Sequence, residues 1–515
     1  MHPSTHASAH PERPACIMAG SGDVMTYGEL DQRSNQVAHF LRGNGICAGD
    51  TIAVVLDNDA WMFPLVWGAQ RAGVYFTCLS YRLSGKDLAY ILSDCGAKLT
   101  FGAKATRSVL EAAKQAGFSG PVELLNAAWS GQTTLADRLK EYPIVRIMDE
   151  MAGSDMLYSS GTTGLPKGVR QPFVADRPID TPTPLLSLSQ KRFGMGPDTV
   201  YLCPAPLYHA GPLRWSMLVH RLGGTVVVME KFDAEAALQA IARYHVNVAQ
   251  FVPTHFSRFL RLPEAVRTHS DLSSLRIALH AAAPCPVPLK RAMLDWWGPI
   301  IHEYYGGTEN NGLTMIGPDE WLSHPGSVGK AYVGELKICD DNGEVLPAGE
   351  TGDVYFAGGS QFEYHNDPDK TQRAYNKHGW STLGDIGHVD ADGYLYLTDR
   401  RNFTIISGGV NIYPQEIENA LCGHPAVADA AVIGAPDADF GERVVAVVEL
   451  MDAAEAGPDM AADIRDFARA KLGSLKAPKL IDFRDSLPRE PTGKLFKKLL
   501  VEEYRKRVPT EGKEQ

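Results

Sequence analysis

The sequence of 515 residues lacks several features that mark common classes of protein. It has no excess of positive charge, because the formal net charge is -11 at pH 7. That balance argues against nucleic acid or an anionic membrane surface as the main partner. The 8 cysteines are scattered, form no C-x-x-C pair and have no histidine nearby at metal-ligand spacing. This usage is typical of reduced thiols in a cytosolic protein rather than of disulfides or a zinc site.

Long apolar runs and targeting signals are also missing. The first 16 residues contain no apolar stretch like that of a signal peptide. The most apolar window, residues 60–70, holds eleven uncharged residues and is too short to span a bilayer. No internal repeat or low-complexity segment is present. We therefore expect a cytoplasmic protein without membrane insertion, and we leave a homodimer open.

Short apolar runs alternate with segments of helical spacing, and this pattern predicts the fold class. The runs lie at 53–56, 225–229, 248–253 and 275–282. Residues 233–245 have apolar positions at helical spacing behind Asp233, a residue type that caps helices. Such alternation predicts an α/β fold with mostly parallel sheets. Residues 335–357 instead predict two strands of a hairpin-like or β-barrel-like insert.

A new series of apolar strands begins after residue 400 and ends in a lysine-rich tail. We therefore expect a domain boundary at about residue 400. Residues 1–400 should form a large domain of layered α/β subdomains with a small β-barrel-like part. Residues 401–515 should form a small α+β domain.

The segment YSSGTTGLPKGV at 158–169 has the composition of a phosphate-binding loop. Its glycines let backbone N–H groups approach an anion, and its serines and threonines add hydroxyl donors. It is not a Walker A loop, because Lys167 is followed by glycine instead of serine or threonine. On composition alone, a surface loop of small residues is an equal alternative.

Six further segments follow, and together with the loop they resemble the ordered signatures of the adenylate-forming superfamily. They are PLYHAG (206–211), AAAP (281–284), YYGGTE (304–309), GWSTLGD (379–385), ISGGVNIYPQEIE (406–418) and PREPTGK (488–494). The superfamily contains acyl- and aryl-CoA synthetases, adenylation domains of peptide synthetases, and luciferases. The ISGGVNIYPQEIE segment is similar to that of the acyl-CoA synthetases.

The resemblance implies where the phosphates of ATP bind. The loop residues concerned are Ser159, Ser160, Gly161, Thr162, Thr163 and Gly164. Lys167 would add positive charge to this loop, and Thr308 would donate to the α-phosphate. Glu309 would bind Mg2+, since a hard carboxylate oxygen suits a hard cation that bridges phosphates.

The resemblance also implies the contacts of the nucleoside. Tyr305 would stack on adenine, which packs beside Ala282 in the small-residue segment. Asp385 would accept the ribose hydroxyls, and Arg400 would contact the same sugar. Leu383 departs from the family pattern, because threonine usually stands at this position and its hydroxyl is missing here.

The acyl group is expected next to the adenine segment. The implied pocket residues are Gly211, Trp215 and Gly307, with Gly306 of the nucleotide segment beside them. His209 resembles the residue that gates the acyl tunnel. We predict a roomy, largely apolar pocket for a medium-chain, aromatic or alicyclic acid rather than acetate. Arg214 either faces solvent or meets a second anionic group of the substrate.

The C-terminal domain is implied to be mobile, presenting one face for each half-reaction. Lys494 would bridge the carboxylate and the α-phosphate during adenylation. Ser407, Gly408 and Gly409 would let the pantetheine arm of CoA pass close to the backbone. Asn402 stands at the usual pivot, where the family most often has aspartate or lysine.

These assignments imply an ATP-dependent carboxylic acid:CoA ligase that uses ATP, Mg2+ and CoA. It would form acyl-AMP and pyrophosphate, and then acyl-CoA and AMP. One alternative is an adenylating enzyme that loads a carrier protein or forms an amide. Another is a non-catalytic nucleotide-binding protein of the same fold, against which the set Lys167, Glu309, Asp385 and Lys494 argues. The partner is a small carboxylic acid, and no nucleic acid is expected.

Overall fold

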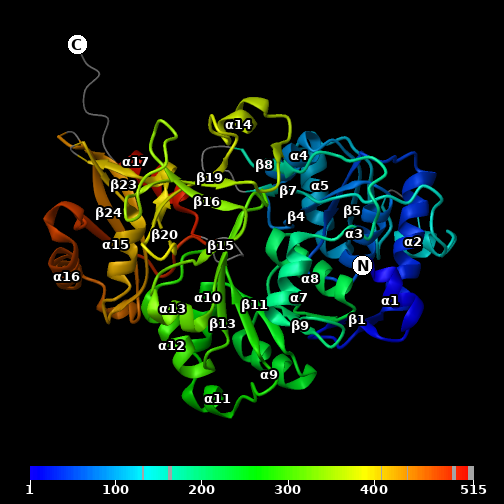
Figure 1. Cartoon of the computed structure of the whole chain (residues 1–515), viewed down its shortest axis with the longest axis horizontal. Coiled ribbons are helices and arrows are strands. Elements are labelled where there is room, and N and C mark those ends of the chain that lie inside the picture. Colours follow the sequence, from blue (N-terminus) through cyan, green and yellow to red (C-terminus); the bar gives the residue numbers. More distant parts are fainter. Residues whose placement is uncertain (130–132, 160–164, 408, 438, 490–494, 508–515) are drawn as a thin grey trace.

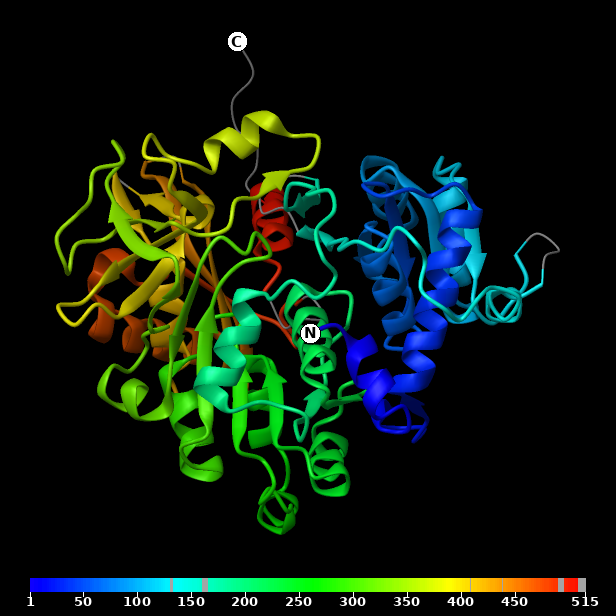
Figure 2. The same ribbon diagram turned by 45° about the vertical axis from the view of Figure 1, so that its right-hand side comes forward.

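The computed structural model describes the chain outside residues 130–132, 160–164, 408, 438, 490–494 and 508–515. It is a mixed α/β structure, as predicted (Figure 1). The blue and cyan N-terminal layers lie beside the green central layers, and the C-terminal part packs at the opposite side (Figures 1 and 2). None of the helices formed by the described residues combines the length and apolar character that a bilayer crossing requires.

The central sheet has the strand order β15-β14-β13-β12-β11-β9-β10-β1-β2. Its strands are β1 (Pro14–Met18), β2 (Val24–Thr26), β9 (Val200–Cys203), β10 (Thr225–Val228), β11 (Val248–Phe251), β12 (Ile277–His280), β13 (Ile301–Tyr305), β14 (Leu313–Ile316) and β15 (Lys330–Val333). The six neighbouring strands β13, β12, β11, β9, β10 and β1 pair in parallel. Strands β2, β14 and β15 add to the edges in antiparallel orientation. The three apolar runs predicted after residue 200 are confirmed as strands.

Helices cover this sheet. They include α7 (Pro184–Phe193), α8 (Ala210–Leu222), α9 (Ala234–Tyr244), α10 (Pro253–Leu260), α11 (Glu264–His269), α12 (Val287–Trp297) and α13 (Pro318–Ser323). Asp233 accepts a hydrogen bond from the N–H of Ala236, 2.9 Å away, so the predicted cap of α9 is confirmed. Parallel strands buried on both faces are near-continuously apolar, which explains why the sequence runs are so short and hydrophobic.

A second, fully parallel sheet has the order β4-β3-β5-β6. Its strands are β3 (Thr51–Val55), β4 (Tyr75–Leu79), β5 (Ala97–Gly102) and β6 (Val122–Leu124). Its helices are α1 (Pro3–Ala9), α2 (Tyr27–Gly43), α3 (Met62–Arg71), α4 (Gly85–Asp94), α5 (Arg107–Gln115) and α6 (Leu135–Leu139). The apolar window at 60–70 is helix α3, which packs into this core and is buried from Met62 to Arg71.

Two smaller antiparallel sheets complete the part of the chain before residue 401. One contains β16 (Glu335–Cys339), β17 (Gly352–Ala357), β19 (Ser381–Val389) and β20 (Leu395–Arg400). Strands β16 and β17 pair antiparallel, which confirms the predicted hairpin. The other contains β18 (Glu363–Tyr364), β8 (Lys167–Arg170) and β7 (Met156–Ser159), with α14 (Pro368–Arg373) following β18.

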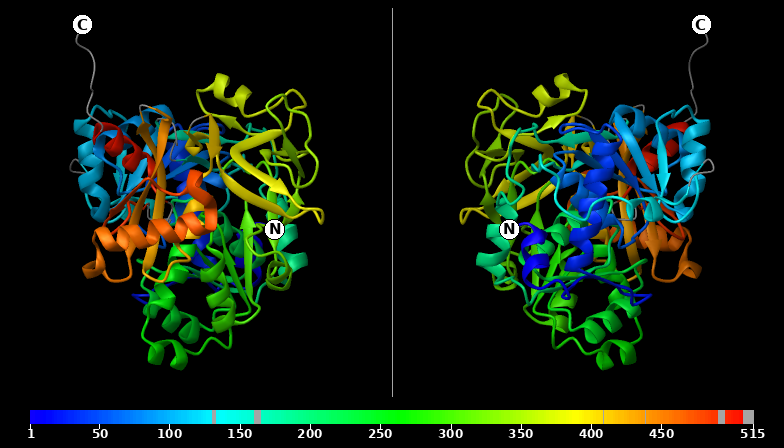
Figure 3. Two further views of the ribbon diagram at one scale, coloured as in Figure 1. Left: turned by 90° about the vertical axis from the view of Figure 1, so that its left-hand side faces the viewer. Right: turned by 90° about the vertical axis from the view of Figure 1, so that its right-hand side faces the viewer.

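The C-terminal part has its own sheet. Its strands are β21 (Ile405–Ser407), β22 (Val410–Ile412), β23 (Val427–Asp437), β24 (Gly441–Leu450) and β25 (Leu480–Phe483). Helices α15 (Pro414–Leu421) and α16 (Pro458–Lys476) pack on one face (Figure 3), and α17 (Lys497–Arg507) packs on the other. The short η2 helix (Arg401–Phe403) connects β20 to this sheet.

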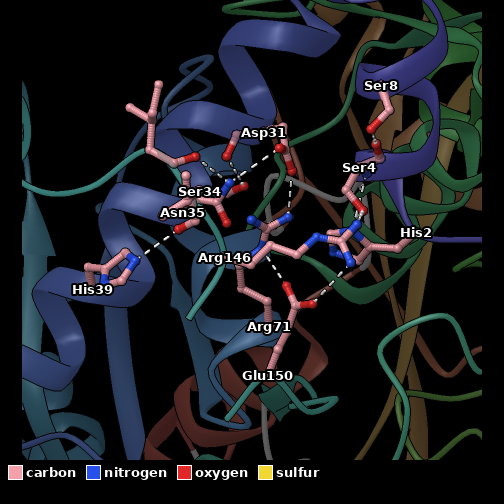
Figure 4. A network of polar contacts seen from close by, with 12 residues as sticks. His2, Ser4, Ser8, Asp31, Ser34, Asn35, His39, Arg71, Arg146 and Glu150 are labelled. Atoms are coloured by element: carbon pink, nitrogen blue, oxygen red, sulfur yellow. Dashed lines mark hydrogen bonds and ion pairs between the residues drawn. The ribbon is translucent and has the colours of Figure 1, made fainter. Parts of the chain in front are cut away.

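A cluster of charges around the buried Arg71, here called the anchor network, holds the N-terminal segment (Figure 4). Arg71 on α3 is fully buried, and its Nη2 lies 2.7 Å from Asp31 Oδ1 on α2. Its Nε lies 3.5 Å from Glu150 Oε1. The other carboxylate oxygen of Glu150, Oε2, lies 3.7 Å from Arg146 Nη1. Arg146 donates to Ser4 Oγ over 2.9 Å. The network thus joins α1, α2 and α3 to the segment before β7.

Candidate nucleotide-binding site

The predicted phosphate loop lies between β7 and β8. Ser159, the last residue of β7, pairs directly with Lys167, the first residue of β8. Residues Ser160, Gly161, Thr162, Thr163 and Gly164 lie outside the described residues. Burial, together with the neighbouring Lys370 ammonium, lowers the pKa of Lys167 to about 8. The lysine is therefore close to losing its charge near neutral pH.

Four side chains from three separate segments form what we call the phosphate-side cluster: Lys167, Lys370, Tyr364 and Glu309. The Lys167 Nζ lies 5.5 Å and the Lys370 Nζ 5.6 Å from the centre of the Tyr364 ring. The Tyr364 hydroxyl donates to Glu309 Oε1 over 3.0 Å. The signature segments of the sequence include Lys167 and Glu309. Lys370 and Tyr364 lie outside these segments, so the sequence did not predict them.

The segment that carries Thr308 and Glu309 follows β13, at the carboxyl end of a parallel strand. In open α/β sheets this end is where ligands bind. A single carboxylate such as Glu309 fits Mg2+, which is usually bound through one or two carboxylates and the phosphates of the substrate. When bound, the metal would supply positive charge beside the β- and γ-phosphates.

Arg214 holds the backbone of this segment by a hydrogen bond. Its Nη2 donates to Asp155 Oδ2 over 2.7 Å and to the Thr308 carbonyl over 2.9 Å. Asp155 immediately precedes β7 and therefore the phosphate loop. The structure thus shows a partner for Arg214 that the sequence did not predict. The guanidinium is partly buried and pairs with a partly buried carboxylate of the same chain.

The predicted nucleoside contacts come together at β13, β19 and β20. The Tyr305 hydroxyl donates to Asp385 Oδ2 over 2.6 Å, and its ring stacks 6.3 Å from Phe356. Asp385 pairs in register with Arg400 across β19 and β20. Ala282 adopts a left-handed backbone with φ 77°, which is uncommon for a residue with a Cβ. Such strain clusters at functional sites. The adenine contact that the resemblance implies for Ala282 stays a prediction.

Leu383, which departs from the family pattern, packs against Gly307 of the YYGGTE segment. A Cβ added at Gly307 would lie 2.6 Å from Leu383 Cδ2 and 2.6 Å from Glu309 Oε2. A Cβ at Gly306 would lie 3.1 Å from the Gly312 carbonyl. A side chain at Gly307 would therefore displace the ends of Leu383 and Glu309, and one at Gly306 would fit only tightly against the Gly312 carbonyl. On the side where a Gly307 side chain would project, the space is filled by protein.

The residues expected around the acyl group lie at the N-terminus of α8. His209 is the N-cap residue of α8, and its ring lies 4.5 Å from the Tyr208 ring. Trp215 is a core residue, only 2% exposed, and its indole N–H donates to the Tyr304 hydroxyl over 3.3 Å. A Cβ at Gly211 would meet Gln250 Nε2 at 2.9 Å and the Tyr304 hydroxyl at 3.3 Å.

The immediate surroundings of Gly211 are therefore polar, and the largely apolar pocket stays a prediction. Tyr201 donates to Gln250 Oε1 over 3.0 Å, and Gln250 Nε2 donates to the Tyr304 hydroxyl over 2.5 Å. Burial raises the pKa of Tyr304 to about 12, so this hydroxyl stays protonated. Periodicity could not reveal this network, because its members come from three strands and one helix.

On the C-terminal side, Ser407 of β21 is buried and pairs with Val410 of β22. Gly408 and Lys494 lie outside the described residues. Gly409 has φ 80°, a left-handed conformation that favours glycine, and open space lies where its Cβ would be. Asn402 lies within η2, between the two sheets that it was predicted to hinge.

The residue before this predicted hinge is paired with β17. Arg401 Nη2 lies 2.8 Å from Asp353 Oδ2 on β17. In the C-terminal part, Lys497 of the lysine-rich tail is buried, and its Nζ lies 2.8 Å from Glu418 Oε1 on α15. The lysine therefore belongs to the core of the C-terminal part, where burial of a charge requires a partner.

The fold and these contacts define the class of protein, an enzyme that forms adenylates. The chain belongs to the family of AMP-binding enzymes: the AMP-binding enzyme model matches residues 4–363, and the AMP-binding enzyme C-terminal domain model matches residues 416–494. It is therefore an adenylate-forming ligase, as the motifs implied. AMP-binding CoA ligases use ATP, Mg2+ and CoA, which agrees with the cofactors expected from the sequence.

Three similar proteins illustrate the range of the family. The chain is 30% identical over 512 residues to the long-chain-fatty-acid–CoA ligase FadD13 of Mycobacterium tuberculosis, covering 98% of each chain. It is 32% identical over 512 residues to the fatty acid–[acyl-carrier-protein] ligase ScoC of Streptomyces coeruleorubidus, covering 97% of this chain and 95% of ScoC. The structure of ATP-bound MatB from Rhodopseudomonas palustris has TM-score 0.84 at 29% identity, covering 98% of this chain and 99% of MatB.

Proposed function

We propose that the chain is an ATP-dependent carboxylic acid:CoA ligase that forms an acyl adenylate and then a thioester. The observation that carries this proposal is the convergence of Lys167 and Glu309 on Tyr364, at the end of the central sheet where Tyr305 meets Asp385. One set of side chains thus suits polyphosphate and Mg2+, and the other suits adenosine.

The chemistry asked of these residues is mainly electrostatic. A carboxylate must approach the α-phosphorus, so one anion approaches another. Lys167 contributes positive charge, Glu309 is the proposed metal ligand, and Arg214 holds the Thr308 backbone in place. Preorganised charge of this kind lowers the barrier because it needs no rearrangement during the reaction.

The first experiment tests the class of reaction. With a suitable acid, ATP and Mg2+, the protein should exchange labelled pyrophosphate into ATP without CoA. It should release AMP once CoA is added. Release of ADP across a broad panel of acids would overturn the proposal.

A second experiment separates the half-reactions, with Lys494 assigned to adenylation and Gly409 to thioester formation. Lys494→Ala should slow adenylation by about 10²–10³ but still convert ready-made acyl adenylate to thioester. Gly409→Leu should obstruct pantetheine while pyrophosphate exchange persists. Because Gly409 has φ 80°, Gly409→Asn is the control: asparagine tolerates this backbone and is shorter. Equal loss of both steps in folded Lys494→Ala and Gly409→Leu would refute the two-face arrangement.

A second candidate function is loading of a carrier protein, because ScoC, whose name describes that activity, matches nearly the whole chain. Thioester formation with CoA and with a phosphopantetheinylated carrier protein should be compared at equal acceptor concentration. Faster transfer to the carrier would favour this alternative over CoA ligation.

The acid is proposed to be medium-chain, aromatic or alicyclic rather than acetate. The polar surroundings of Gly211, formed by Gln250 and Tyr304, further favour an acid with a hydrogen-bonding group away from its carboxylate. A matrix of acids assayed for AMP release should therefore rank such acids above their purely hydrocarbon analogues. Highest kcat/KM for acetate or propionate would contradict the proposed acid class.

A further inference from the structure

Two lysines that are far apart in the sequence lie on the same aromatic ring. Lys167 begins β8, and Lys370 lies on α14. Their Nζ atoms are 5.5 Å and 5.6 Å from the centre of the Tyr364 ring, whose hydroxyl donates to Glu309 Oε1 over 3.0 Å. Tyr364 therefore sets both ammonium groups next to the proposed metal ligand.

Two ammonium groups lie side by side at this ring, and such an arrangement suits an anionic ligand. Burial is the largest cause that lowers the pKa of Lys167, and the closeness of Lys370 lowers it further. Glu309 and Asp367 act in the opposite direction. Asp367 also accepts the backbone N–H of Lys370 over 3.0 Å as the cap of α14, which fixes its position and leaves its negative charge in place. Two cations thus lie side by side near two carboxylates, one of which, Glu309, is proposed to bind metal.

We propose that Lys370 is a second phosphate-binding cation, which acts with Lys167 on the β- and γ-phosphates of ATP. This assignment rests on the proposed function and adds a residue that no signature segment contains. A lysine ammonium is a compact point charge that suits phosphate oxygens without a fixed geometry. Since AMP has no β- or γ-phosphate, Lys370 distinguishes ATP from AMP.

The test compares the affinities for the two nucleotides. Dissociation constants of Mg-ATP and of AMP are measured by calorimetry for the wild type, Lys370→Met and Lys370→Arg. Lys370→Met should bind ATP about tenfold more weakly, or about 1.4 kcal/mol. It should bind AMP within about twofold of the wild type, which also shows that the site is folded. Lys370→Arg should recover most of the ATP affinity because it keeps the charge.

Lys377→Met is the matched control, since this exposed lysine pairs with Glu344 and lies outside the cluster. It removes the same charge and should leave both affinities unchanged. An unchanged ATP affinity in Lys370→Met, or equal losses for ATP and AMP, would overturn the assignment of Lys370 but not the proposed function. A wild type that binds no ATP would overturn the proposed function together with it.

Discussion

The anchor network and the phosphate-side cluster differ in how their charges are balanced. In the anchor network, the buried Arg71 guanidinium lies between Asp31 and Glu150 of the same chain. In the phosphate-side cluster, Lys167 and Lys370 lie on one ring and Glu309 is a nearby carboxylate. A cation held between carboxylates holds elements together, whereas two cations side by side cost stability and suit an anionic ligand.

The largest effect is expected from breaking the anchor network. Arg71→Met removes the cation beside Asp31 and leaves Glu150 with only the more distant Arg146, and breaking a buried pair typically costs about 3–5 kcal/mol. The free energy of unfolding, measured by chemical denaturation, should fall by that amount. Lys167→Met, which also removes one cation, should show no such loss. Equal destabilisation by both changes would contradict the idea that the anchor network stabilises the fold whereas Lys167 does not.

Arg214 combines features of both clusters, because it is neutralised by Asp155 but also positions Thr308. Arg214→Gln should lower the rate of pyrophosphate exchange by about 10–100-fold, equivalent to about 1.5–3 kcal/mol for a hydrogen bond to a charged group. Asp155→Asn should reproduce part of this loss, and the double mutant should lose less than the sum of the two. Full additivity would show that the two residues act independently.

The affinity for ATP should fall with rising pH as Lys167 loses its proton. Its pKa is lowered to about 8, so the ammonium is present below pH 8 and is lost above it. The affinity for ATP should therefore fall by about tenfold between pH 7.5 and pH 9.5, as expected for the loss of one phosphate contact. The affinity for AMP should change less. Lys167→Met should bind ATP weakly with a flat profile over this range.

The smallest effect is a gain of stability when one of the two adjacent cations is removed. The folded pKa of Lys167 is lower than that of an unfolded lysine, so keeping it protonated in the fold costs free energy below pH 8. Lys167→Met should therefore raise the free energy of unfolding by up to about 1 kcal/mol at pH 7, a typical trade of function for stability. The gain should shrink at pH 10. A loss at pH 7 would contradict the interpretation that the adjacent cations cost stability.

Local patterns predicted the elements that depend on local physics. The strands at 225–228, 248–251 and 277–280 were readable because strands buried in a parallel sheet are continuously apolar. The start of α9 was readable because Asp233 bonds to a backbone N–H three residues ahead. The ATP site was predicted through ordered motifs, and the family match confirms the class to which they pointed.

The contacts that the sequence could not predict all join segments distant in the chain. Arg214 reaches both Asp155 and Thr308, and Lys370 reaches the ring beside Lys167, without any periodicity that relates these positions. The sequence by itself determined the layers, the motif order and the glycine turns, because propensity, burial and backbone freedom act over a few residues. Only the tertiary structure decided which charges meet and which polar groups surround Gly211, because Coulomb forces and hydrogen bonds depend on distance in space.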